Sequence, residues 1–171
     1  MYEYKVNILK VVDGDTVDVV IDLGFGCWLR NERVRIVGID CPESRTSDRI
    51  EKVFGEAAKQ RLTSLLSSEA ILISQVSKMG ENKKGKFGRI LGDFRTINDQ
   101  VVSITLMEEG HAVAYNGGDK EAVQAQHLKN RQRLIDEGTE PTPDGMTLTP
   151  NKVNTFKATK PPLRKKKSKK K

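Results

Sequence analysis

Residues 33–43 have the sequence RVRIVGIDCPE, and the fold can be worked out from this stretch in both directions. Apolar and charged side chains alternate along its first half. Val34 and Ile36 therefore share one face of an extended strand, and Arg33 and Arg35 share the other. The proline near its end stops the strand, because the residue before a proline is extended and the proline has no N–H to donate. We predict a half-buried strand with two arginines on its open face and two carboxylates at its end.

Four further segments have the composition of strands. Residues 2–12 are rich in β-branched and apolar residues, and residues 17–23 alternate, so that the turn at 13–15 joins two strands. Residues 70–76 and 89–94 predict two more strands downstream. With the strand that begins at Arg33, the chain is expected to form five strands.

Two segments predict helices and a third is ambiguous. Apolar residues recur at helical spacing over 54–65, and again over 120–137, where Gly138 stops the helix. Residues 99–109 contain many Val, Ile and Thr, which suits a strand, but they end at a glycine that suits the end of a helix. The apolar side chains of Ala125, Leu128 and Ile135 are expected to lie on one face of the last helix.

Positive charge is concentrated at the C-terminal end of the 171 residues. Ten of the 30 Lys and Arg lie in residues 151–171, which contain no acidic residue. Without them the formal charge falls from +7 to −3, so the preceding part must bind any polyanion through local groups or a metal ion. We expect one domain over 1–138 and a disordered, Pro- and Lys-rich tail over 139–171. Three roles fit the tail: raising nucleic-acid affinity through counterion release, which we favour, localisation, or solubility.

No apolar run approaches the roughly 20 residues that span a bilayer, and the N-terminus lacks the layout of a secretion signal. These observations favour a cytoplasmic protein, although a secreted mature form also fits. We expect a monomer that does not contact membranes. Cys27 and Cys41 are expected to be reduced thiols, with Cys27 a small buried side chain and Trp28 in the core or at its rim.

Carboxylates gather at the ends of predicted strands. Asp13 and Asp15 flank a glycine, and Asp40 and Glu43 follow the strand that carries Arg35. Either pair alone fits a tight turn or a surface ion pair. Together they suit phosphodiester hydrolysis, because hard divalent cations take several oxygen ligands, a glutamate can activate water, and arginine can hold phosphate oxygens.

The chain resembles the staphylococcal nuclease (thermonuclease) family over roughly residues 5–138. The motifs that carry the resemblance are residues 12–17, 35–43, 55–58, 86–89 and 126–128, in this order. The resemblance implies an α+β, mainly β fold, namely a five-stranded OB-fold barrel with three α-helices. It also favours a helix over residues 99–109.

The resemblance also implies a metal site. Asp15 and Asp40 match carboxylates that bind Ca²⁺, and the backbone carbonyl of Cys41 matches a further ligand. The family usually has threonine at this position, and a cysteine leaves the carbonyl in place while its thiol can admit softer cations. Asp13 matches an acid that contacts the metal ligands without binding the metal itself. The alternative is that Asp13 is an ordinary turn residue.

Catalytic roles follow from the same resemblance. Glu43 matches the residue usually assigned as general base, and Arg35 and Arg89 match two guanidinium groups that clamp the phosphate. His111 and His127 lie on predicted helices without a partner at ligand spacing, so structural or surface roles are favoured for both.

Substrate-binding positions can be carried over in the same way. Phe87 stands where the family commonly has tyrosine, and Tyr115 matches another aromatic residue that can stack on a base. The structural alternatives are an aromatic packed at a strand start for Phe87 and a residue at the core edge for Tyr115. Lys86, with Lys83 and Lys84, either lines the entrance to the cleft or forms a solvated loop face.

The sequence therefore predicts a calcium-dependent nuclease that hydrolyses DNA and RNA with little sequence specificity. The alternative is a non-catalytic barrel of the same family that binds nucleic acid or protein. Such modules typically lack the acids and arginines, all of which are present in this chain, so the enzyme is favoured.

Overall fold

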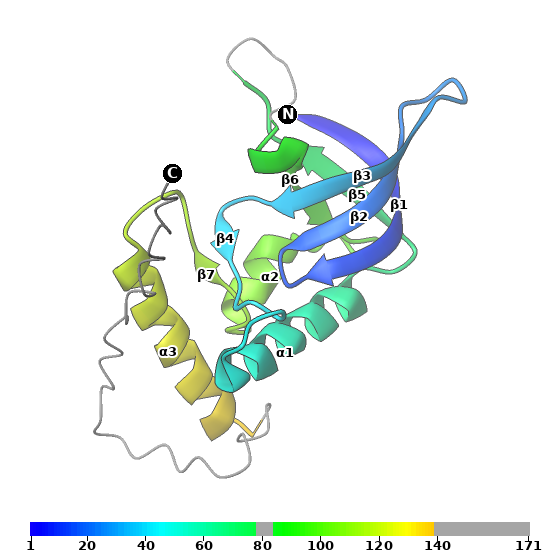
Figure 1. Ribbon diagram of the computed structural model, residues 1–171. Coiled ribbons are helices and arrows are strands. Elements are labelled where there is room, and N and C mark those ends of the chain that lie inside the picture. The colour runs from blue at the N-terminus through cyan, green and yellow to red at the C-terminus, as the bar shows by residue number, and fades with distance from the viewer. Residues whose placement is uncertain (78–83, 139–171) are drawn as a thin grey trace, which may run out of the picture.

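The architecture was analysed in a computed structural model, which describes residues 1–77 and 84–138 (Figure 1). The predicted tail and the domain boundary at its start lie outside the described residues. The elements in chain order are β1 (Tyr2–Asp13), β2 (Thr16–Asp22), β3 (Trp28–Ile36), β4 (Ile39–Asp40), α1 (Arg49–Leu65), β5 (Glu69–Ser74), the short 3₁₀ helix η1 (Lys86–Gly88), β6 (Ile90–Arg95), α2 (Val102–Glu108), β7 (Val113–Ala114) and α3 (Lys120–Asp136).

Five strands form a closed barrel in the order β1-β2-β3-β6-β5. Four of the five neighbouring pairs are antiparallel, whereas β3 and β6 are parallel, with Val34 opposite Ile90 and Arg35 opposite Leu91. This confirms the predicted α+β fold, a five-stranded OB-type barrel with three α-helices. It also shows that residues 102–108, within the ambiguous segment, are helical.

The barrel interior is filled by apolar side chains from every barrel strand. Val34 and Ile36 of β3 are fully buried while Arg33 and Arg35 point outward, as the alternation predicted. Helices α1 and α2 add Ala58, Leu62 and Leu106 to the same core. Because one face of each strand packs into this core, the strand register is fixed, and this register places Arg35 on the outer face.

The strand predicted from Arg33 to Ile39 divides into two. Gly38 has a φ of +78°, which ends β3 and starts the two-residue strand β4. β4 pairs with β7, so that Asp40 lies opposite Val113 in a separate two-stranded sheet. Strands of two residues have no periodic pattern, and for this reason the sequence did not predict either of them.

The apolar face of α3 is not the face that packs against the domain. The buried residues are His127, Arg131 and Leu134, whereas Ala125 and Leu128 are exposed and Ile135 is half-buried. Polar groups dock this helix: the Asn130 amide donates to the carbonyl of Ala112 at 3.1 Å, and the Arg131 guanidinium lies 5.6 Å from the centre of the Phe54 ring. A pattern based on apolar residues cannot find such a face.

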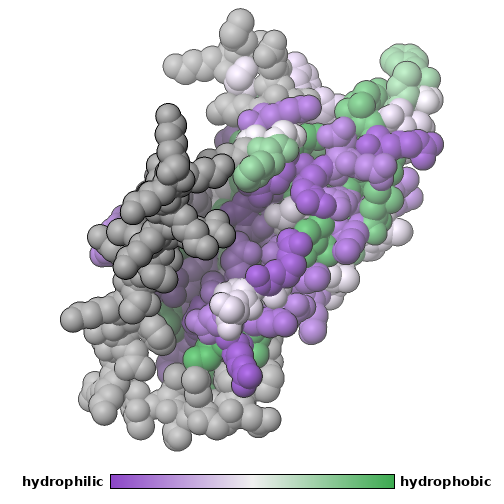
Figure 2. Space-filling view, in the orientation of Figure 1, coloured by the Kyte–Doolittle hydropathy of each residue, from purple (hydrophilic) through white to green (hydrophobic). Residues whose placement is uncertain are grey.

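The β2–β3 hairpin extends beyond the barrel (Figure 1). Phe25 at its tip is fully exposed, and green apolar surface covers this end of the molecule in Figure 2. Cys27 is exposed in the same turn, so the prediction of a buried side chain is wrong, and Trp28 lies at the rim rather than in the core. Both cysteines are free, as expected. Among the described helices, none has both the length and the apolar character to cross a membrane.

Candidate active site

The close approach of Gly14 to Cys41 and Ala58 brings together the two carboxylate motifs, residues 13–15 and 40–43. Gly14 lies so near Cys41 and Ala58 that an added Cβ would stand 2.9 Å from the Cβ atom of each. The turn between β1 and β2 therefore packs directly on the segment after β4. A residue with any side chain at position 14 would push the two motifs apart.

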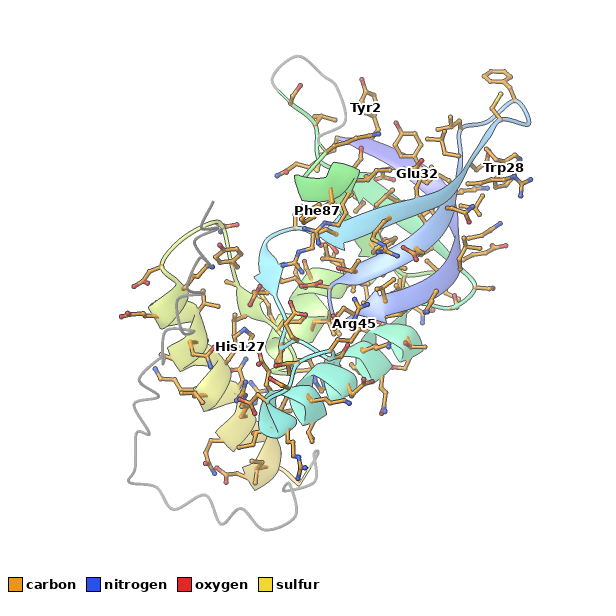
Figure 3. All side chains as sticks on the ribbon, in the orientation of Figure 1. Tyr2, Trp28, Glu32, Arg45, Phe87 and His127 are labelled. Carbon is orange, nitrogen blue, oxygen red and sulfur yellow. The ribbon has the colours of Figure 1, made fainter. Side chains whose placement is uncertain are left out.

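These motifs open onto a cleft of about 790 Å³. Its lining includes five acidic residues and four arginines: Asp13, Asp15, Asp18, Glu32, Glu43, Arg33, Arg35, Arg45 and Arg89. Figure 3 shows Phe87, next to β6, and Arg45, next to α1, on either side of the ends of β1 and β3. The cleft thus combines groups that can hold a cation with groups that can hold a phosphate.

Arg35 joins the two carboxylates expected to bind metal. One guanidinium nitrogen contacts Asp15 Oδ2, and the other lies 3.4 Å from Asp40 Oδ1. The second Asp15 oxygen accepts a hydrogen bond of 2.7 Å from the Thr16 hydroxyl. Asp15 and Asp40 therefore converge on one point, which Arg35 occupies as an internal cation.

Asp13 supports the loop that carries Glu43. Its Oδ1 accepts hydrogen bonds from the backbone N–H groups of Gly14 at 3.0 Å and Ser44 at 3.3 Å. The Arg45 guanidinium lies 3.9 Å from Oδ2. Asp13 thus stabilises its own turn and also holds the loop that contains Ser44, next to Glu43.

The environment of Glu43 raises the pKa of its carboxyl group. Partial burial raises the pKa of this carboxyl, and the negative charge of Asp13, a hydrogen bond with Asp13 and the charge of Asp40 raise the pKa further. A carboxylate whose pKa is raised accepts a proton more readily, which suits a general base.

Asp40 has a second partner that the sequence analysis did not find. His127 Nε2 lies 3.1 Å from Asp40 Oδ2, and the histidine is buried. Burial raises the pKa of Asp40, but the hydrogen bond and charge of His127, with the charge of Arg35, lower the pKa by more. His127 thus has a buried, structural position beside the candidate metal site, which is one of the two roles favoured from the sequence, whereas the surface role is wrong. Nothing in the local sequence pairs it with Asp40, although motif 126–128 contains it.

Cys41 turns its side chain into the core. Burial raises the pKa of the thiol, so that it remains protonated. This does not support the expectation that the thiol admits softer cations, because thiolate is the form that binds metals. The backbone carbonyl remains the group that we expect to serve as a ligand.

Phe87 and Arg89 both line the cleft. Phe87 is 96% exposed and has a φ of 61°, a left-handed conformation that is unfavourable for an aromatic residue. The alternative of an aromatic packed at a strand start is therefore wrong. Lys84 is exposed, while Lys83 and the side chain of Lys86 lie outside the described residues.

Tyr115 lies in an adjoining hollow rather than in the main cleft. The hollow has a volume of about 330 Å³ and is lined by Gly38, Leu91 and Tyr115, and Arg35 belongs to both spaces. A backbone hydrogen bond of 2.8 Å from Tyr115 to the carbonyl of Gly38 holds the segment there. The structure thus places this aromatic within reach of one wall of the site.

The side chains fit calcium only in part. Among residues 1–77 and 84–138, no three His, Cys, Asp or Glu side chains form a metal-binding group. Two converging carboxylates can still suffice for this ion, because calcium accepts carbonyl oxygens and water as further ligands. A cation would bind the same oxygens of Asp15 and Asp40 that now face Arg35.

The barrel and its cleft define an OB-fold protein whose site combines carboxylates with arginines. The chain belongs to the staphylococcal nuclease homologue family, because the model of that family matches residues 33–135, more than half of the chain. The match runs from within β3 to near the end of α3. It includes Arg35, Asp40, Cys41, Glu43, Arg89 and His127, whereas Asp13 and Asp15 precede it.

Similar proteins include enzymes. The chain is 28% identical over 132 residues to a thermonuclease of Staphylococcus intermedius, covering 74% of this chain and 72% of that protein. It is 29% identical over 121 residues to Protein ParB of Escherichia coli, covering 66% of this chain and 58% of that protein. It is 29% identical over 119 residues to Endonuclease YhcR of Bacillus subtilis (strain 168), covering 66% of this chain but only 9% of that protein.

Proposed function

We propose that the chain is a calcium-dependent nuclease that hydrolyses the phosphodiester bonds of DNA and RNA with little sequence specificity. One observation carries the proposal. Asp15, Arg35, Glu43 and Arg89 come from four segments and line one cleft, where Arg35 also contacts Asp40. Membership of the family and the relatives named as nucleases support the same conclusion. The presence of these carboxylates and arginines favours an enzyme over a non-catalytic binding module of the same family, because such modules typically lack them.

Each group has a role that follows from its chemistry. Asp15 and Asp40 would hold a calcium ion, which when bound would supply positive charge and lower the pKa of coordinated water. Glu43 would take a proton from the attacking water. Arg35 and Arg89 donate hydrogen bonds to the phosphate oxygens, whose negative charge increases as the bond to water forms.

The aromatic side chains account for binding without base recognition. Phe87 stands fully exposed beside the cleft, where its ring face can stack on a base. Stacking tolerates any sequence, because every base has a π-face. The unfavourable backbone of Phe87 is consistent with a residue kept for binding, since the surrounding structure must compensate for its strain.

The proposal is tested by cleavage assays on single- and double-stranded DNA and on RNA, with calcium or with a chelator. We expect cleavage with calcium, loss of cleavage with the chelator, and its return when calcium is restored. Asp15→Asn should reduce cleavage strongly. Asp99→Asn is the matched control, because Asp99 is exposed and lies outside the cleft. Intact nucleic acid in the presence of calcium would contradict the proposal.

The basic tail is expected to strengthen binding rather than catalysis. Deleting residues 151–171 removes ten positive charges. Each contact with a phosphate of double-stranded DNA contributes about −0.9 to the slope of log K against log salt concentration. We expect the deletion to weaken binding at low salt and reduce this slope, with turnover at saturating DNA unchanged. An unchanged slope would exclude the tail as a phosphate contact.

A further inference from the structure

Helix α3 contributes one buried side chain to the candidate metal site. His127 is 5% exposed, and Figure 3 shows it on the side of α3 that faces the rest of the domain. Its Nε2 lies 3.1 Å from Asp40 Oδ2. A carboxylate only accepts hydrogen bonds, so Nε2 carries the proton and donates it to this oxygen.

The two oxygens of Asp40 therefore have different partners. Oδ2 accepts from His127, whereas Oδ1 lies 3.4 Å from Arg35 on the side of the cleft. In the proposed reaction Arg35 binds the phosphate, and His127 is then the partner that remains on Asp40 among the described residues. The strand that carries Asp40, β4, is only two residues long.

His127 can restrain Asp40 because α3 is itself held in place beside it. The amide of Asn130 is bonded to the carbonyl of Ala112, next to β7, and β7 pairs with β4. On the following turn the Arg131 guanidinium packs over Phe54 of α1. The imidazole and the strand that carries Asp40 are thus parts of one connected unit.

We propose that His127 is a positioning residue that fixes the Asp40 carboxylate for calcium binding. This inference rests on the proposed function. Hydrogen-bond partners of metal ligands set the orientation of those ligands, and their loss typically lowers metal affinity about 10- to 100-fold. His127 does not line the cleft, so in this proposal it acts through Asp40 alone.

The experiment is calorimetric titration of calcium into the full-length chain without nucleic acid. His127→Ala should weaken calcium binding at least about 10-fold. His127→Gln should restore most of the affinity, because its side-chain amide can donate to Asp40 Oδ2. Leu128→Ala is the matched control on the same helix turn, since Leu128 is 54% exposed, and it should bind calcium as the parent does.

Kinetics supply a second readout. With His127→Ala, the calcium concentration for half-maximal cleavage should rise, whereas kcat at saturating calcium and KM for DNA should change little. A residue that only stabilises the fold would not produce this separation. If the alanine variant does not fold, His127→Phe fills the same space without a donor and should show the same loss of affinity.

The outcomes separate the two proposals. Calcium binding of equal strength in the parent, His127→Ala and His127→Phe overturns the positioning role and leaves the proposed function standing. A parent chain that cleaves DNA but binds no calcium overturns both the calcium requirement and the positioning role. Equal loss of affinity in the Gln and Phe variants shows that the donor is not what matters, which also overturns the inference.

Discussion

Arg35→Lys is expected to cleave DNA about 10²- to 10³-fold more slowly than the parent chain, with the fold unchanged. The guanidinium of Arg35 lies between Asp15 and Asp40 and forms part of both the cleft and the adjoining hollow. Lysine keeps the charge but cannot donate two parallel hydrogen bonds from a planar group. The measurement is kcat at saturating calcium and DNA.

The matched control is Arg95→Lys. Arg95 also forms ion pairs with two acidic side chains, Glu3 and Asp99, but it does not line the cleft. Its variant should retain parental turnover, since ion pairs between exposed groups contribute little to stability. Near-full activity in Arg35→Lys would remove Arg35 from the mechanism.

Gly55→Ala is expected to destabilise the protein and to lower its turnover. An added Cβ at Gly55 would stand 2.5 Å from the carbonyl carbon of Glu43 and 2.6 Å from the nitrogen of Ser44. Forcing extra atoms into a packed region typically costs about 1–3 kcal/mol. The backbone that would have to move carries both the proposed general base and the N–H group that binds Asp13.

Gly55→Ala is expected to change the free energy of unfolding in the opposite direction to an ordinary glycine-to-alanine substitution in a helix. Inside a helix, replacing glycine by alanine normally stabilises by about 1 kcal/mol, because alanine loses less backbone entropy on folding. Urea unfolding should instead show a lower free energy of unfolding for Gly55→Ala. Gln60→Ala on the exposed side of α1 should leave both stability and turnover close to the parent. A stabilised and active Gly55→Ala would contradict the close approach of α1 to the Glu43 loop.

The sequence predicts what depends on local periodicity. The burial of Val34 and Ile36, and so the outward direction of Arg35, follows from alternation with a period of two. Asp15, Arg35, Glu43 and Arg89 line one cleft, and they belong to three of the motifs that carry the family resemblance. The strand faces follow from periodicity alone, whereas the grouping of Arg89 with the other three was implied only by the resemblance.

Contacts between distant polar residues could not be predicted in this way. His127 and Asp40 meet because α3 docks through His127, Asn130 and Arg131, and no hydrophobic pattern marks such a face. For the same reason the apolar side chain of Leu128 is exposed, since the helix docks through its polar residues. Cys27 was misplaced because a hairpin turn beyond the barrel exposes side chains whatever their polarity.

The parallel pairing of β3 with β6 has a consequence for folding. The β1–β2 and β2–β3 pairs join neighbours in the chain, whereas Arg35 meets Leu91 only after a long loop has closed, and long loops close slowly. Arg89 immediately precedes β6, so this same pairing brings Arg35 and Arg89 to one cleft. If these arginines clamp the phosphate as proposed, chains that have not closed the barrel lack the clamp, and a newly made molecule should cut nucleic acid only when its fold is complete.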